Sequence, residues 1–202
     1  MTIDRAAFFN AIRPSVFLGH LNQGEVDGLS FILDEWEAIP AFTDTRWLAY
    51  MLGTAYHETA ATMRPVHEYG GDAYLTRLYD VTGDRPAMAR AMGNTVPGDG
   101  PRYCGRGYVQ LTWKNNYLRM GILVGLDLVK NPDLAMDPKT AVKIMFRGMT
   151  DPNPRNTFSG VNLQHYLAGK RADWVGARHV INGTDHAGEI AETAQRFNAA
   201  LS

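Results

Sequence analysis

The amino-acid sequence predicts a mainly α-helical protein of two lobes with one irregular, loop-rich insertion. Apolar residues recur at three- and four-residue steps over most of the chain, which is the spacing of one face of an α-helix. Between about residues 62 and 107 this periodicity gives way to glycine, proline, tyrosine and aspartate. The 202 residues, 45% of them hydrophobic and 20% charged, suffice for one substantial domain. We therefore expect a single domain over residues 1–202, divided into two lobes.

Capping residues mark two of the expected helix starts. Asp44 precedes an apolar-periodic run that continues to Glu58, and an aspartate in this position accepts hydrogen bonds from first-turn amides. Asp137 is followed by Pro138, a residue favoured at the first helical position. The periodicity predicts helices over residues 4–12, 22–36, 45–58, 114–126, 139–149, 161–167, 172–180 and 189–201.

The insertion covers residues 62–107. Its runs at residues 69–72 and 94–101 consist of residues that form turns and end helices. A stretch of this length without regular structure is unusual inside a compact domain unless it has a function. We expect it to build the walls of a binding cleft and to hold at most a short helix near residues 85–92.

The net charge, the cysteine content and the hydropathy of the sequence limit which partners and which cellular compartment we expect. The formal net charge is −1, with 20 basic and 21 acidic residues, so no basic surface predicts a nucleic-acid partner. Cys104 is the single cysteine, which excludes an intramolecular disulfide and fits a reducing compartment. The first residues do not have the pattern of a signal peptide, and no run of 18 apolar residues occurs. We expect a monomer without stable membrane association.

Two glutamates are candidates for acid–base chemistry. Glu58 ends an apolar helix, where burial and the helix dipole both disfavour a negative charge and so favour a protonated acid. Glu68 follows ten residues later in irregular chain and is expected to stay solvated and ionised. Glycoside hydrolysis uses two carboxylates in such different environments. The alternative is that both are ordinary surface acids, since most carboxylates in proteins only solvate the surface.

A metal site is the other interpretation of this region. His57-Glu58 and His67-Glu68 form two His–Glu pairs, but the zinc-protease motif requires a second histidine four residues after the first, and position 61 is alanine. A zinc site from His57, His67 and a distant third ligand remains an alternative, whereas our expectation is no metal and no cofactor. Cys104 has no pattern of nucleophile and base around it and is expected to be a packing residue.

A run of aromatic and short polar residues covers positions 103–117. Gly105 and Gly107 flank Arg106, so that the backbone can approach another group closely. Amide and hydroxyl side chains then alternate with aromatic rings, and sugar-binding clefts use this combination because rings pack on pyranose faces and amides bind hydroxyl groups. The alternative is the aromatic start of a core helix. The polar residues of the run are Gln110, Thr112, Asn115 and Asn116.

Several motifs in order resemble the family 19 glycoside hydrolases, the class I chitinases and their bacteriophage endolysin relatives. The resemblance covers roughly residues 45–185 and implies a lysozyme-like bilobal helical fold, an inverting mechanism and β-1,4-linked glycans containing N-acetylglucosamine. The motifs are His57-Glu58-Thr59, the run from Tyr103 to Thr112, Asn116-Tyr117, Asn131-Pro132-Asp133-Leu134, Asp137-Pro138, and Val180-Ile181-Asn182-Gly183.

The resemblance also implies roles for individual residues. Glu58 matches the general acid, Glu68 the general base, and Thr112 the hydroxyl residue that helps to hold the attacking water. An arginine supports the acids in plant members, and Arg196 is a loose candidate for it here. The implied substrate-binding residues are Tyr103, Gln110, Asn116 and Asn182.

Other phrases, at residues 45–50, 63–70 and 93–100, resemble phage and prophage endolysins. This branch implies a peptidoglycan-degrading enzyme of the lysozyme type that stays in the host bacterial cytoplasm until a phage-encoded pore releases it to the cell wall. Cleavage next to N-acetylmuramic acid and next to N-acetylglucosamine both remain open. The rival functions are a chitinase, a catalytically silent glycan-binding module and a zinc amidase that cuts the peptide stem.

Overall fold

The computed structural model describes residues 2–181 and 183–202. The chain divides into two compact units, Met1–Arg64 with Met145–Ser202 and, between them in sequence, Pro65–Ile144. Most regular elements are helices and the strands are only two residues long, so the prediction of a mainly α-helical fold is confirmed. Among the described residues, no helix has both the length and the hydropathy needed to cross a bilayer.

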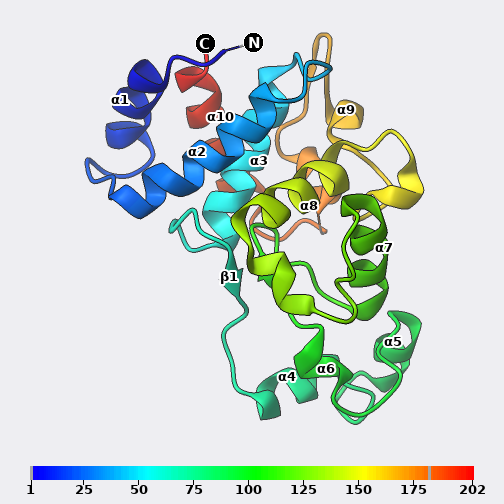
Figure 1. The fold of residues 1–202 in the computed structure, drawn as a ribbon. Coiled ribbons are helices and arrows are strands. Elements are labelled where there is room, and N and C mark those ends of the chain that lie inside the picture. The colour runs from blue at the N-terminus through cyan, green and yellow to red at the C-terminus, as the bar shows by residue number, and fades with distance from the viewer. Residues whose placement is uncertain (1, 182) are drawn as a thin grey trace. The chain divides into compact units, whose positions relative to one another are not determined.

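The first unit is built around the pairing of two long helices, α3 and α10 (Figure 1). They approach so closely that a Cβ atom at Gly53 would lie 2.9 Å from the backbone of Ala194. The elements of this unit are α1 (Arg5–Ser15), α2 (Gln23–Glu37), α3 (Thr45–Glu58), the end of α8 (Pro138–Thr150), η2 (Pro154–Asn156), α9 (Leu163–Tyr166), β3 (Leu167–Ala168), β4 (Arg171–Ala172), η3 (Gly176–Val180) and α10 (Ala187–Ala200).

The start of α3 follows from its sequence as expected. Asp44 is the N-cap, and its carboxylate accepts a hydrogen bond from the Arg46 amide. The middle of the helix is buried from Leu48 to Ala55. The helix ends at Glu58 and is capped by Thr59, so Glu58 lies where a buried helix reaches the surface of its unit. The contact of α3 with α10 fixes this end of the helix.

The second unit has short helices around a small hairpin. Strands β1 and β2 pair antiparallel, with Val66 opposite Gly107 and His67 opposite Arg106. This pairing brings the chain after β1, which carries Glu68, beside Gly105. The elements of this unit are β1 (Val66–His67), α4 (Asp72–Tyr79), α5 (Pro86–Ala91), α6 (Asp99–Arg102), β2 (Arg106–Gly107), α7 (Lys114–Val124), η1 (Pro132–Met136) and the start of α8.

Asp80 holds the glycine-rich loop of this unit in place. Its carboxylate accepts hydrogen bonds from the amides of Gly98 and Gly100, at 2.8 and 2.9 Å, and from both the amide and the hydroxyl of Thr82. Asp80 is 1% exposed. Burial by itself raises the pKa of Asp80, but these hydrogen bonds outweigh it, so the pKa lies below its usual range.

Most of the expected helices are present with boundaries close to those predicted, namely α1, α2, α3, α7, α8 and α10. The segment of residues 62–107 holds three helices, α4, α5 and α6, and not one at most. The helix expected over residues 161–167 is reduced to the four residues of α9. The helix expected over residues 172–180 is wrong, because β4 and the 3-10 helix η3 occupy this stretch.

Candidate active site

Glu58 of the first unit faces a buried arginine. The Arg178 Nη1 atom donates to Glu58 Oε1 at 2.9 Å, and the two side chains are 5% and 16% exposed, respectively. Arg178 belongs to η3, and its Nε atom also donates to the backbone oxygen of Asp185 at 3.0 Å. The guanidinium is therefore fixed between a carboxylate and a carbonyl group.

This pair gives Glu58 a different charge environment from the one expected from the sequence. The sequence predicted that burial and the helix end favour the protonated acid. The structure instead places a guanidinium within hydrogen-bond distance of this carboxylate. The arginine that contacts Glu58 is therefore Arg178 and not Arg196, the loose candidate from the sequence. Arg196 instead contacts Glu192 and the Ser15 backbone oxygen.

Sequence reasoning missed Arg178 because it lies 120 positions from Glu58 and inside a stretch expected to be an ordinary helix. One local signal was available. Arg178 stands between Ala177 and Val180, both buried, and a charged residue in an apolar stretch requires a partner. The signal predicts a buried ion pair but does not name the acid.

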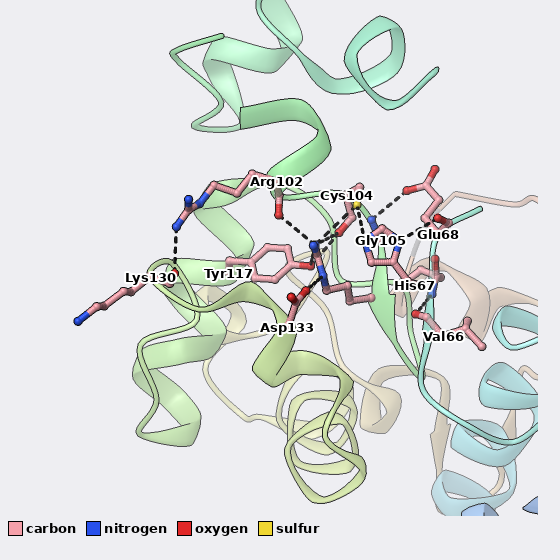
Figure 2. Close-up of polar contacts among 11 residues, drawn as sticks. Val66, His67, Glu68, Arg102, Cys104, Gly105, Tyr117, Lys130 and Asp133 are labelled. Atoms are coloured by element: carbon pink, nitrogen blue, oxygen red, sulfur yellow. Dashed lines mark hydrogen bonds and ion pairs between the residues drawn. The ribbon is translucent and has the colours of Figure 1, made fainter. Parts of the chain in front are cut away.

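Glu68 of the second unit is held by two hydrogen bonds. The Tyr79 hydroxyl donates to Oε1 at 2.7 Å. The Gly105 amide donates to Oε2 at 2.9 Å (Figure 2). Both bonds fix the position of the carboxylate. Burial, and next the bond to Glu68, raise the pKa of Tyr79, so this phenol remains a donor. Glu68 is half-buried, so protein donors as well as water stabilise its charge.

Gly105 is required at this position because two side chains converge on its Cα. A Cβ atom there would lie 2.5 Å from Gln110 Oε1 and 3.0 Å from Glu68 Oε2. The Gln110 amide donates to the Val66 backbone oxygen at 3.0 Å. Glu68 and Gln110 are therefore neighbours, as expected for two members of one site.

Arg106 fastens the loop that carries Gly105. Its guanidinium donates to Asp133 Oδ1 at 2.9 Å, to the Arg102 carbonyl at 3.0 Å and to the Tyr117 hydroxyl at 3.0 Å (Figure 2). The Tyr117 hydroxyl in turn donates to the Cys104 carbonyl at 2.7 Å. Arg106 is 6% exposed, so its role is to support the backbone.

Cys104 packs in this network as expected. It is fully buried, and its sulfur lies 3.4 Å from His67 Nε2. Burial raises the pKa of the Cys104 thiol and disfavours a thiolate. The neighbouring Tyr103 is 2% exposed, and its hydroxyl donates to the Val129 carbonyl. This burial does not support the predicted contact of Tyr103 with a glycan, and we assign it to the core.

Thr112, Asn116 and Arg119 form a chain of hydrogen bonds. The Thr112 hydroxyl donates to the Gln110 carbonyl at 2.8 Å, which ties this chain to the neighbours of Glu68. The Asn116 amide donates to the Thr112 carbonyl at 2.8 Å and accepts from Arg119 Nη2 at 2.6 Å. The structure thus places Gln110 beside Glu68 and links Gln110, Thr112 and Asn116 by hydrogen bonds. Asn182, the last predicted substrate-binding residue, lies outside the described residues.

A helical fold with a carboxylate paired to arginine in one unit, and a hydrogen-bonded carboxylate among amide and hydroxyl groups in the other, has the side chains of a glycosidase. Residues 39–180 match the sequence profile of the class I chitinases, family 19 of the glycoside hydrolases. This match covers more than half of the chain, and the chain belongs to that family. The predicted membership of the family 19 glycoside hydrolases is therefore confirmed.

Individual relatives agree with this family. An endochitinase of Pisum sativum is 30% identical over 68% of this chain and 46% of its own length. An endochitinase of Gossypium hirsutum is 32% identical over 72% of this chain and 54% of its own. The chain thus spans about half the length of the curated relatives it matches. A solved bacterial family 19 chitinase has the same fold, with a TM-score of 0.63 and 21% identity over 100% of this chain and 96% of its own.

Proposed function

We propose that this protein hydrolyses β-1,4 glycosidic bonds of peptidoglycan by a single displacement with inversion. One observation carries the proposal: each unit holds one of the two candidate glutamates, and the two are held differently. Glu58 faces the Arg178 guanidinium, whereas Glu68 accepts from the Tyr79 hydroxyl and the Gly105 amide. Two carboxylates in distinct environments are what acid–base hydrolysis of a glycoside requires.

Glu58 is the general acid in this proposal. It protonates the glycosidic oxygen as the bond to the leaving sugar breaks, and it is left as a carboxylate. Arg178, 2.9 Å away, stabilises that carboxylate and so helps the proton leave. A bound glycan excludes water from the half-buried Glu58, which favours the protonated form before the reaction. The glycan thus acts on Glu58 before the proton transfer, and the arginine acts on it afterwards.

Glu68 is the general base. It takes a proton from a water molecule that attacks the anomeric carbon from the opposite face of the sugar. The Thr112 hydroxyl uses its hydrogen toward the Gln110 carbonyl, so its oxygen has lone pairs left to accept from that water. Inversion requires the two carboxyl groups to stand about 6.5 to 9.5 Å apart when substrate is bound.

Arg119 supports an anionic glycan as the substrate. Within residues 2–181 and 183–202, no carboxylate pairs with this side chain, and its Nε atom is buried without a hydrogen-bond partner. Burial lowers the pKa of Arg119, because the charged guanidinium loses contact with water. Its Nη2 atom contacts Asn116, a residue expected to bind substrate. Peptidoglycan carries carboxylates on its lactyl groups and peptide stems, whereas chitin is neutral.

Chitin is the second candidate substrate, and the names of the relatives favour it. Several plant proteins that match are named chitinases or endochitinases, one is named an inactive chitinase-like protein, and solved neighbours are named chitinases. Chitin and peptidoglycan share the β-1,4-linked backbone of N-acetylated sugars. The acid–base machinery proposed above serves either polymer, so the substrate has to be decided by experiment.

The deciding experiment measures reducing-sugar release from purified peptidoglycan and from chitin oligomers by the wild type, Arg119→Lys and Arg119→Gln. We expect faster release from peptidoglycan, a loss of about tenfold on peptidoglycan for Arg119→Gln, and near wild-type activity for Arg119→Lys. Chitin cleavage should fall less than peptidoglycan cleavage for Arg119→Gln and stay near the wild type for Arg119→Lys. Faster release from chitin would instead establish the chitinase. An initial product with retained anomeric configuration by NMR would contradict the mechanism.

We also propose that the protein waits in the bacterial cytoplasm until a phage-encoded pore releases it to the wall. The single, buried cysteine supports this, because a fold without disulfides is compatible with a reducing compartment. Fractionation of expressing cells, together with a measurement of their lysis, tests the idea. We expect lysis only when a pore-forming protein is co-expressed, and lysis without it would contradict the proposal.

A further inference from the structure

A cluster of metal-ligating side chains lies where α3 ends and α10 begins. His57, His186 and Glu189 each offer one ligand atom, and these three atoms lie within 4.8 Å of one another. We propose that this cluster binds a divalent transition-metal ion of the Zn²⁺ type. All three residues belong to the first unit. The inference does not depend on the proposed hydrolysis.

One distance between ligand atoms already matches that of a tetrahedral site, and the others lie within 4.8 Å. Zinc–nitrogen and zinc–oxygen bonds of about 2.0 to 2.1 Å place neighbouring ligand atoms about 3.3 Å apart. His186 Nδ1 lies 3.1 Å from Glu189 Oε2, so this edge of the tetrahedron is already formed. The His57 ring lies 4.7 Å from the His186 ring, between centroids. His186 and Glu189 are 46% and 75% exposed, so small side-chain movements can close the remaining distance.

Asp185 supplies a second carboxylate behind His186. Its Oδ1 atom lies 3.6 Å from His186 Nε2, on the ring nitrogen that does not face Glu189. Histidines that bind metals usually donate their other N–H group to a carboxylate or carbonyl, which fixes the tautomer. If Nδ1 binds the ion, Nε2–H points to Asp185. The arrangement therefore has an outer partner as well as ligands.

Charge and space also favour a cation here. The carboxylates of Glu58, Asp185 and Glu189 lie in this region, together with the guanidinium of Arg178. A pocket of about 230 Å³ opens beside the cluster and is lined by His57 and Glu189, among other residues. A water molecule occupies about 30 Å³, so the pocket has room for an ion with a water as its fourth ligand.

The ligand set selects the class of metal. Two imidazoles and one carboxylate suit Zn²⁺ and its first-row neighbours, whereas Ca²⁺ and Mg²⁺ prefer oxygen ligands. The packing of α3 on α10 at Gly53 and Ala194 already fixes the helices that carry the ligands. A bound ion would join the end of one helix to the start of the other and stabilise the first unit.

The experiment titrates untagged protein with Co²⁺ and follows the visible absorption of a cobalt–imidazole site, with Zn²⁺ affinity obtained by competition. Thermal unfolding is measured with and without Zn²⁺. We expect saturable binding of one ion, a higher Tm with Zn²⁺, and a loss of affinity of at least about tenfold for His186→Ala and for Glu189→Gln. Asp185→Asn should weaken binding to a smaller extent.

Two controls make the test specific. Glu192→Gln changes an exposed glutamate one turn further along α10, and His20→Ala removes an exposed histidine outside the cluster. Both should bind the metal like the wild type. Circular dichroism verifies that each variant is folded, and Glu189→Gln is the decisive variant because its side chain is largely exposed. The proposal is overturned if the wild type does not bind Co²⁺, or if Glu189→Gln binds as tightly as Glu192→Gln.

Discussion

Arg178 Nη1 lies 2.9 Å from Glu58 Oε1, and both side chains are largely removed from solvent. The pair joins the end of α3 to η3, a segment 120 residues further along the chain. Breaking one partner of a buried pair is costly because the other charge remains buried. The relationship therefore has consequences for stability and, under the proposed mechanism, for catalysis.

Replacing Arg178 with methionine should lower both activity and stability. We expect the free energy of unfolding to fall by about 2 to 4 kcal/mol, since Glu58 would be left without its cation. The rate of glycan cleavage should fall about a hundredfold, because the carboxylate formed after proton transfer loses its stabilisation. Urea denaturation and reducing-sugar release measure the two effects. Arg196→Met is the matched control, and a similar loss of activity in it would contradict the assignment of Arg178.

Replacing Gly105 with alanine should disturb Glu68 directly. The new Cβ atom would meet Gln110 Oε1 at 2.5 Å and Glu68 Oε2 at 3.0 Å, so at least one of these side chains must move. We expect a destabilisation of about 1 to 3 kcal/mol and a clear loss of activity. Gly188→Ala, where no atom lies within 4 Å of the added carbon, should be neutral or slightly stabilising. Equal activity in the two variants would show that Glu68 does not need this geometry.

Tyr79→Phe should remove the hydrogen bond that supports Glu68 while leaving the fold intact. The change removes the hydroxyl that donates to Glu68 at 2.7 Å but keeps the ring that packs edge-on against Trp113. We expect kcat to fall about tenfold and the free energy of unfolding to change by about 1 kcal/mol. Steady-state kinetics and urea denaturation measure both. An unchanged kcat would remove Tyr79 from the catalytic account.

Asp80→Asn should weaken the protein in a pH-dependent way. The pKa of Asp80 in the folded state lies below its usual value, so the ionised carboxylate stabilises the fold. This contribution is complete above the unfolded-state pKa of about 3.9 and is lost as the pH falls through the folded-state value. We expect the variant to be about 2 to 4 kcal/mol less stable near neutral pH. Denaturation curves from pH 7 to pH 3 should show the difference shrinking, and a constant difference would contradict this origin.

The long helices could be predicted from the sequence because their signals are local. Asp44 caps α3 by accepting from the Arg46 amide, and apolar residues at helical spacing continue to the helix end. The short helices α4 and α6 have weaker signals. Asp99 accepts hydrogen bonds from the amides of Thr95 and Val96, and this local turn starts α6 although its residues are glycine- and proline-rich. Such side-chain bonds cannot be recognised from periodicity.

The wrong helix over residues 172–180 has a similar cause. The Asp173 carboxylate accepts from the Gly176 amide at 2.8 Å, and a turn of this kind competes with the helical hydrogen-bond pattern. Arg178 is then held by Glu58, a contact between distant parts of the chain. Glu58 and Glu68 could be named as candidate acids from their local sequence, and their catalytic roles stay predictions, whereas the arginine that pairs with Glu58 could not be predicted.

Glu58→Gln tests the central claim most directly. Reducing-sugar release from peptidoglycan is measured for the wild type, for Glu58→Gln and for the control Glu192→Gln, with circular dichroism to verify the fold. Glutamine keeps the shape of the side chain but has no proton to give to the leaving oxygen. The account predicts release by the wild type and by Glu192→Gln, and a loss of at least about a thousandfold for Glu58→Gln. Wild-type release by folded Glu58→Gln would show that another group is the acid.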